Sequence, residues 1–235
     1  GLRAAVIKVD DDKGLELAAE LESSGVDLWT VGVNRPARLQ ARDVSHTAKG
    51  LAFDVVEGAQ AIRMQSHVIG SYNVSNLLGV LATLRAQGIA LPDAVAACST
   101  LLPVPGRMEC VGGDAAPLVA VDYAHTPDAL DQALRALQPV ARSRGGRLWC
   151  VFGCGGDRDA TKRPLMGAVA AAQSDRVVVT SDNPRSENPL AILAQMQAGL
   201  AHPDLARVEP DRSRAIADQI ALAGVADVVL IAGKG

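Results

Sequence analysis

The order of apolar and polar positions changes character about halfway along the chain. From residue 118 onward, short apolar runs alternate regularly with longer stretches of helical periodicity. That alternation predicts strands and helices following one another in a parallel, doubly wound sheet, which is an α/β fold. The expected strands cover residues 118–123, 148–152, 176–180, 206–208 and 227–232, and the expected helices cover residues 127–141, 161–172, 189–200 and 212–223.

The pattern before residue 103 is less regular but also mixes strands with helices. Two short alternating segments around a turn near Gly58 predict an antiparallel pair of strands. Ser71 is expected to cap the helix that follows, and Gly88 to end it. The expected strands cover residues 4–9, 27–33, 51–56 and 62–68, and the expected helices cover residues 14–22, 69–88 and 92–101.

A turn-rich break separates the two patterns. It reads Pro-Val-Pro-Gly at residues 103–106, a composition typical of a linker between compact regions. We therefore predict two α/β domains, residues 1–106 and residues 107–235, of which the second is Rossmann-like and mostly parallel.

The composition excludes several classes of function. With 49% hydrophobic and 21% charged residues the chain is typical of a well-packed globular protein. A net charge of −3 and only 3% aromatic residues argue against general binding to nucleic acid or to a membrane surface. The cysteines form no CxxC pair, so we expect reduced thiols in a cytoplasmic protein and no metal site. They are Cys98, Cys110, Cys150 and Cys154.

A glycine-rich turn, Gly153 to Gly156, follows the expected strand at 148–152 and precedes a helix. Such a turn could hold a phosphate at the helix N-terminus. It departs from the dinucleotide fingerprint GxGxxG because Arg158 stands at the third glycine position. A tight turn without a ligand, and a substrate loop in which Arg158 supplies charge, remain open as alternatives.

The tetrapeptide Asp182-Asn183-Pro184-Arg185 follows the next expected strand. The carboxyl ends of parallel strands meet at the edge of the sheet where ligands bind. An aspartate and an arginine on one rigid turn suit a zwitterion, because the first pairs with an ammonium and the second with a carboxylate. The alternative is an Asx-turn that is followed by a solvated arginine.

Other polar residues stand where strands and helices begin or end. His125 follows an expected strand and precedes a helix, so it is a candidate general base or a helix cap. Asn73 and Asn76 share a face at a helix start, where asparagine is also a common cap. Arg107 and Glu109 follow the break, where they could reach a ligand or remain solvated.

Seven segments, taken together and in order, resemble the Mur ligases. They are SYNVSNLLG, GRMECV, VDYAHTPDAL, VFGCGGDRDATKRPLMG, TSDNPRSENP, EPDRSRAI and IAGKG. The resemblance covers essentially the whole chain and is strongest to the MurE type, which adds the third amino acid, meso-diaminopimelate, to the peptidoglycan precursor. It implies that residues 1–106 are the later half of a central ATP-binding domain and that residues 107–235 are an amino-acid-binding domain.

The resemblance also implies a reaction and its partners. A carboxyl group of the UDP-linked muramoyl dipeptide is phosphorylated by ATP, with Mg²⁺, and an amine of diaminopimelate attacks the acyl phosphate. The implied protein is a cytoplasmic monomer that acts on small molecules and not on nucleic acid or a membrane. Its implied ATP-binding residues are Asn76, Arg107, Asp122 and His125, and its implied diaminopimelate-binding residues are Arg158, Asp182, Asn183, Pro184, Arg185 and Gly233.

The chain also departs from that family's pattern. It contains no GxxGKT phosphate loop. We therefore expect a fragment that lacks the family's N-terminal domain, the magnesium ligands and carbamylated lysine of the central domain, and the extreme C-terminus. Alone, such a fragment is expected to hold no catalytic residue and to show no ligase turnover. The alternatives are a non-catalytic amino-acid or nucleotide-binding module and a dinucleotide-dependent oxidoreductase.

Overall fold

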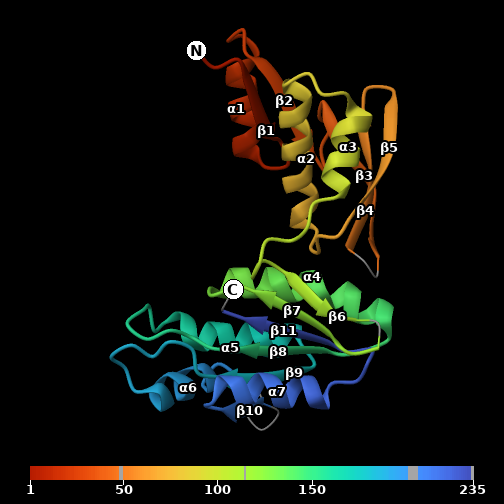
Figure 1. Cartoon of the computed structure of the whole chain (residues 1–235). Helices are drawn as coiled ribbons and strands as arrows, with labels where there is room; N and C mark the ends of the chain where they lie inside the picture. The colour runs from red at the N-terminus through yellow and green to blue at the C-terminus, as the bar shows by residue number, and fades with distance from the viewer. Residues whose placement is uncertain (48–49, 114, 201–205, 234–235) are drawn as a thin grey trace. The chain divides into compact units, whose positions relative to one another are not determined.

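The computed structural model describes residues 1–47, 50–113, 115–200 and 206–233. The chain forms two compact units, Gly1–Leu102 and Pro103–Gly235, and each has its own sheet (Figure 1). Both sheets carry helices, so the predicted α/β fold class is confirmed. Lys234 and Gly235, at the end of the IAGKG segment, lie outside the described residues.

Unit 1 contains a mixed five-stranded sheet in the order β1-β2-β3-β4-β5. The pairs β1·β2 and β2·β3 are parallel, whereas β3·β4 and β4·β5 are antiparallel. Helices α2 and α3 bury an apolar cluster against this sheet, centred on Phe53, Leu78 and Leu81. The elements are β1 (Ala4–Lys8), α1 (Asp12–Glu22), β2 (Asp27–Gly32), β3 (Leu39–Thr47), β4 (Gly50–Glu57), β5 (Gln60–Ser66), α2 (Tyr72–Ala86) and α3 (Leu91–Ser99).

Two details of unit 1 differ from the sequence-based expectation. Strand β3 was not expected, because its register shifts between Arg42 and Ser45 and Asp43 has a φ of 51°, which breaks the alternation of side chains. Ser71 precedes α2 but has helical dihedral angles, and its side chain makes no capping hydrogen bond. Gly88, with a φ of 87°, follows the end of α2 as expected.

Unit 2 contains a six-stranded sheet in the order β10-β9-β8-β11-β7-β6. All neighbours are parallel except β6, which is antiparallel to β7. The short edge strand β6 was not expected, whereas the strands and helices predicted after residue 118 are all present. The elements are β6 (Glu109–Gly112), β7 (Leu118–Asp122), α4 (Pro127–Arg144), β8 (Leu148–Phe152), α5 (Lys162–Gln173), β9 (Arg176–Thr180), α6 (Pro189–Gln197), β10 (Ala206–Glu209), α7 (Arg212–Leu222) and β11 (Val228–Ala232).

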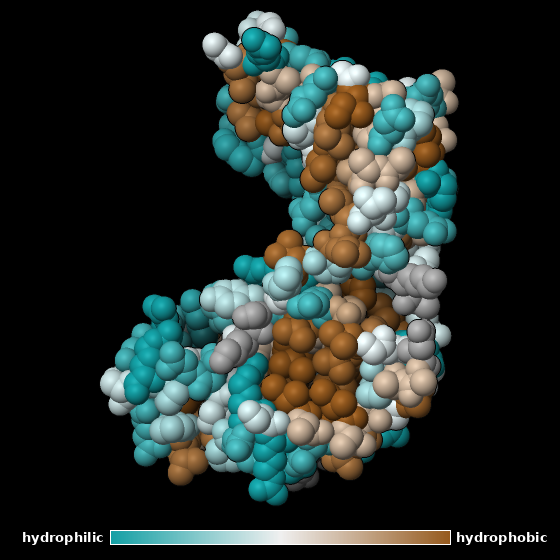
Figure 2. All heavy atoms as spheres, in the orientation of Figure 1, coloured by the Kyte–Doolittle hydropathy of each residue, from teal (hydrophilic) through white to brown (hydrophobic). Residues whose placement is uncertain are grey.

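The two faces of the second sheet are covered unequally. Helices α4, α5 and α6 pack side by side against the sheet, and α7 buries a separate cluster with Trp149, Val151 and Val229. Across the sheet, Val229 of β11 pairs with the half-buried Val119 of β7, which in turn pairs with the exposed Val111 of β6. Figure 2 shows apolar residues gathered over this part of unit 2. The parallel strands deliver their carboxyl ends to one common edge.

Candidate functional site

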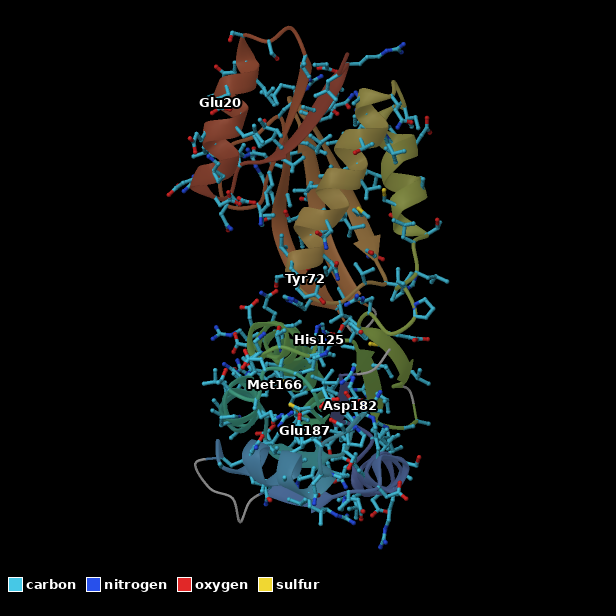
Figure 3. The ribbon with its side chains drawn as sticks, turned by 90° about the vertical axis from the view of Figure 1, so that its left-hand side faces the viewer. Glu20, Tyr72, His125, Met166, Asp182 and Glu187 are labelled. Atoms are coloured by element: carbon cyan, nitrogen blue, oxygen red, sulfur yellow. The ribbon has the colours of Figure 1, made fainter. Side chains whose placement is uncertain are left out.

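A cavity of about 440 Å³ lies at the carboxyl edge of the second sheet. Its lining comes from the segments that follow β7, β8, β9 and β11, together with the first turns of α5. Figure 3 shows His125, Met166 and Asp182 gathered in this region of unit 2. The lining residues are Tyr123, His125, Thr126, Gly153, Cys154, Gly155, Arg158, Asp159, Lys162, Arg163, Met166, Asp182, Arg185 and Gly233.

The structure brings most of the predicted amino-acid-binding residues together. Arg158, Asp182, Arg185 and Gly233 all line the cavity. Asn183 is exposed beside it, and its side-chain oxygen accepts a hydrogen bond of 3.2 Å from the Arg185 amide, which is the Asx-turn considered above. Neither Asn183 nor Pro184 is among the lining residues. Whether these residues bind an amino acid stays a prediction.

Two turns meet backbone to backbone beneath the cavity. They are residues 153–158 after β8, and residues 182–188 after β9. A Cβ atom added to Gly156 would lie 1.9 Å from the Pro184 carbonyl oxygen, and the Gly156 amide donates a 2.8 Å hydrogen bond to the Asn183 carbonyl. A Cβ atom on Gly153 would lie 2.7 Å from the Thr180 carbonyl. These glycines therefore permit the close approach of two chain segments, which explains them without a dinucleotide.

Arg185 is held by the neighbouring turn. Its Nη1 atom donates a 2.6 Å hydrogen bond to the Gly156 carbonyl. The guanidinium crosses Gly155, where an added Cβ atom would lie 2.8 Å from Nη1. Its backbone has a φ of 48°, the left-handed region that is uncommon for a side chain of this size. The guanidinium is therefore tied to the neighbouring turn at one end, while the side chain as a whole is exposed.

The charges around the cavity are partly paired. Arg163 forms a bidentate ion pair with Glu187, and Lys162 lies 3.8 Å from Asp159. Among the residues that the structure describes, Arg158 and Asp182 have no hydrogen-bonding or ion-pair partner for their side chains, and Arg185 has no anionic partner. The cavity thus presents Arg158 and Arg185 to a ligand, together with Asp182, whose charge also interacts with the partly buried Arg212.

Cys154 lines the cavity as a largely buried thiol. Cys154 lies 3.5 Å from the sulfur of Met166, and burial raises the pKa of its thiol to about 12. All the cysteines are free, as expected. Within the described ranges, no group of three or more His, Cys, Asp or Glu side chains could hold a metal ion.

Three of the predicted nucleotide-binding residues lie together in unit 2. The Arg107 guanidinium lies 4.9 Å from the ring centre of Tyr123, and the rings of Tyr123 and His125 are also 4.9 Å apart in an edge-on arrangement. Tyr123 was not singled out from the sequence, although it stands between Asp122 and His125. An aromatic ring flanked by a cation and an imidazole can stack against a planar ligand.

Asp122 orders the chain around this group. Its carboxylate accepts hydrogen bonds from the Met108 amide at 2.9 Å and from the Ala124 amide at 2.8 Å. Met108 is buried and has a φ of 49°, so this contact supports a strained backbone beside Arg107. His125 does not cap α4, which corrects one of the two expectations for it. The Thr126 hydroxyl makes that cap instead, through the Ala129 amide.

Asn76 belongs to unit 1. It lies on α2 and donates a 2.9 Å hydrogen bond to the Asn73 side chain, whose own amide reaches the Ile69 carbonyl. The two asparagines therefore share a helix face, as predicted. The role of Asn76 in nucleotide binding stays a prediction, because the group around Tyr123 belongs to unit 2.

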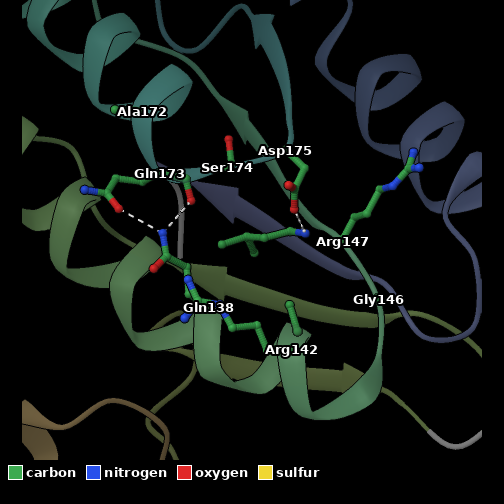
Figure 4. A pocket seen from close by; sticks show the side chains of 10 residues that line it. Gln138, Arg142, Gly146, Arg147, Ala172, Gln173, Ser174 and Asp175 are labelled. Atoms are coloured by element: carbon green, nitrogen blue, oxygen red, sulfur yellow. Dashed lines mark hydrogen bonds between the residues drawn. The ribbon is translucent and has the colours of Figure 1, made fainter.

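A second cavity, of about 290 Å³, lies at the opposite edge of the second sheet (Figure 4). Gln138 of α4 bonds there to Gln173 of α5, and the Asp175 carboxylate accepts from the Leu148 amide. No residue predicted to bind a ligand lies in it. Ligands of open α/β sheets bind at the carboxyl edge, so the larger cavity is the candidate site.

Known proteins resemble the chain over its full length. Residues 106–235 match the family "Mur ligase, glutamate ligase domain", and residues 2–84 match "Mur ligase middle domain". The UDP-N-acetylmuramoyl-L-alanyl-D-glutamate--2,6-diaminopimelate ligase of Acidovorax sp. (strain JS42) is 60% identical over 100% of this chain and 47% of that protein. The protein of the same name from Ralstonia nicotianae is 48% identical, with coverage of 100% and 47%.

Solved structures agree with these matches. A structure of a UDP-N-acetylmuramoyl-L-alanyl-D-glutamate--2,6-diaminopimelate ligase has a TM-score of 0.73 and 36% identity, covering 100% of this chain and 48% of that one. A folylpolyglutamate synthase from Thermotoga maritima has a TM-score of 0.76 but 17% identity over 98% and 51%, which shows the fold alone. The chain spans about half the length of the curated relatives it matches. No helix in the described part is long and apolar enough to cross a membrane.

Proposed function

The chain belongs to the Mur ligase family, and from this premise we propose that the protein is an ATP-dependent ligase of peptidoglycan precursor synthesis. It joins an amine of meso-diaminopimelate to a carboxyl group of the UDP-linked muramoyl dipeptide. The name of the 60% identical relative supports this choice of substrates. We further propose that it acts as a monomer in the cytoplasm.

The arrangement of charges around the larger cavity carries the proposal. Diaminopimelate carries a second carboxylate at its far end, and we assign Arg185 to that carboxylate, with Arg158 on the neighbouring turn as its partner. Asp182 suits an ammonium group. Lysine has no second carboxylate, so it would leave these arginines without an anion. Arginine is well suited to this role because its planar fork binds a carboxylate through two hydrogen bonds.

Amide formation requires activation of the carboxyl group. A carboxylate is a poor electrophile until one of its oxygens becomes a leaving group, and ATP supplies the phosphoryl group that achieves this. In unit 2, Arg107, Tyr123 and His125 would bind the nucleotide, with Asp122 fixing the chain beside them. Magnesium, when bound, neutralises phosphate charge, and we assign it no ligand among the described residues.

The test compares amino acids in the protein at its full natural length. Turnover is measured as phosphate release with ATP, the UDP-linked dipeptide, and either meso-diaminopimelate or lysine. The natural protein should prefer diaminopimelate, and Arg185→Ala should reduce that preference about tenfold to a hundredfold, the equivalent of roughly 1.5–3 kcal/mol for a charge-assisted pair. Arg185→Lys should restore part of it, since an ammonium cannot form the bidentate fork.

Arg142→Ala is the matched control. It removes one exposed arginine of unit 2 that lines only the cavity at the opposite edge of the sheet. The control should leave the preference unchanged. An Arg185→Ala protein that prefers diaminopimelate as strongly as the natural one would refute the assignment. Binding of diaminopimelate without any turnover would instead favour a non-catalytic binding module.

A further inference from the structure

We propose that Arg163 and Glu187 are positioning residues for the amino-acid substrate, because their ion pair fixes the two turns that carry Arg158 and Arg185. The inference rests on the proposed function for the identity of that substrate. The pair itself is a feature of the fold, and neither residue has been given a role above. Glu187 and Asp182 are both labelled in unit 2 in Figure 3.

Arg163 is the largest fully buried side chain of the described residues, with 1% of its surface exposed. It lies on the first turn of α5. Its Nη1 and Nη2 atoms each lie 2.7 Å from an oxygen of Glu187, a bidentate arrangement. Nη1 also donates to the Gln195 side chain at 2.6 Å, and Nη2 to the Gly155 carbonyl at 3.2 Å. The guanidinium therefore connects three segments: the turn at residues 153–158, the turn at residues 182–188, and helix α6.

Glu187 extends the connection to the residue before Arg158. Its carboxylate accepts a 2.6 Å hydrogen bond from the Asp157 amide. The Asp157 carboxylate in turn accepts from the Ser186 hydroxyl at 2.6 Å and from the Ser186 amide at 3.3 Å. Asp157 has a φ of 54°, a conformation that needs support from its surroundings.

The network therefore ends beside both substrate arginines. Asp157 directly precedes Arg158, and Ser186 directly follows Arg185. Two further hydrogen bonds join the turns at Gly156, one to the Asn183 carbonyl and one from the Arg185 guanidinium. Two arginines bind a carboxylate most tightly when their positions are set before the ligand arrives, because less conformational entropy is then lost on binding.

The pair also neutralises a buried charge. Arg163 lines the cavity, and Glu187 is the anion that its guanidinium binds, while Asp157 adds a smaller favourable charge. Without Glu187, the buried guanidinium would lose its ion-pair partner, which is strongly destabilising. Glu187 thus acts on the substrate indirectly, by keeping the two turns in position.

The test uses Glu187→Gln, which keeps the shape of the side chain and removes its charge. In the full-length protein, the KM for diaminopimelate should rise about tenfold to a hundredfold, the size of effect expected when reacting groups are misplaced by about 1 Å. The KM for ATP should change less than about twofold. The preference for diaminopimelate over lysine should fall in parallel. Arg163→Lys should retain more of the preference than Arg163→Ala, because it keeps the charge.

Glu57→Gln is the matched control, because Glu57 forms a bidentate pair with Arg85 in unit 1. It should lower thermal stability without changing the diaminopimelate KM. A second readout needs no substrate. Amide hydrogen exchange at Gly156 and Asp157 should accelerate in Glu187→Gln, whereas exchange in β8 should not.

Three results would overturn the inference. The first is an unchanged KM for diaminopimelate in Glu187→Gln. The second is an equal rise in the KM for diaminopimelate and the KM for ATP, accompanied by a loss of stability as large as that of the Glu57→Gln control. Unchanged exchange at Gly156 and Asp157 would remove the structural basis of the inference whatever the substrate. Failure of the proposed function is seen separately, as a natural protein that does not prefer diaminopimelate to lysine.

Discussion

Replacement of Gly156 by alanine tests whether the contact between the two turns determines the site. Gly156 does not have a positive φ, so alanine introduces no backbone strain of its own. The new Cβ atom, however, would lie 1.9 Å from the Pro184 carbonyl oxygen, and such atoms do not approach closer than 3.0 Å. The neighbour is backbone and cannot rotate away. The turns must therefore separate by about 1.1 Å, a shift comparable with those that reduce activity a hundredfold.

The size of the effect follows from the hydrogen bonds that span the gap. The Gly156 amide donates to the Asn183 carbonyl at 2.8 Å, and the Arg185 guanidinium donates to the Gly156 carbonyl at 2.6 Å. Losing both costs about 2 kcal/mol of stability at about 1 kcal/mol each. The displaced Arg185 should raise the KM for diaminopimelate about a hundredfold, equivalent to about 2.8 kcal/mol. Urea unfolding of the chain and steady-state kinetics of the full-length protein measure the two quantities.

Two other glycine substitutions make the comparison specific. Gly155→Ala meets only the end of the flexible Arg185 side chain, at 2.8 Å, so it should raise the same KM with less loss of stability. Gly79→Ala lies in helix α2 with nothing within 4 Å, so it should stabilise the chain by about 0.5–1 kcal/mol. If Gly156→Ala unfolds at the same urea concentration as the natural chain and keeps its KM, the turns are not held by this contact and the reasoning is wrong.

Two further predictions concern titratable groups. Burial raises the pKa of Cys110 to about 11 and that of Cys154 to about 12. Neither thiol should therefore react with a thiol reagent at pH 8 in the folded chain, whereas both should react in denaturant. Rapid labelling of Cys154 in the folded chain would contradict this prediction. Hydrogen bonds from Arg163, and then from the Asp157 amide, lower the pKa of Glu187 from 4.5 to about 2. Because that pKa is depressed by folding, the stability from the pair is complete above pH 4.5 and is lost as the pH falls toward 2. The difference in melting temperature between natural chain and Glu187→Gln should therefore shrink over this interval, and a difference that stays constant would exclude the pair as its cause.

Much of unit 2 could be predicted from the sequence because its signals are local. Each strand after residue 118 is a short apolar run, and each helix has a periodic apolar stripe, so both can be recognised without knowledge of their neighbours. The rule that parallel strands end at one edge predicted that the turns carrying Arg158, Asp182 and Arg185 lie together, and these residues line one cavity. Gly233, implied by the family resemblance, lines the same cavity. Strands β3 and β6 were missed for local reasons too: β3 contains a bulge, and β6 is only four residues long.

Only the tertiary structure revealed the contacts that hold the cavity together. In the sequence, Arg163 reads as one more polar residue at a helix start, and Glu187 as part of a loop 24 residues away. Nothing local distinguishes a buried arginine from a solvated one, because burial depends on which segments the fold stacks above it. The same holds for Gly156, which has no room for a side chain because the Pro184 carbonyl lies against it. It also holds for Tyr123, whose contact with the Arg107 guanidinium only the structure shows. Periodicity follows from neighbours along the chain, whereas pairing across turns follows from neighbours in space.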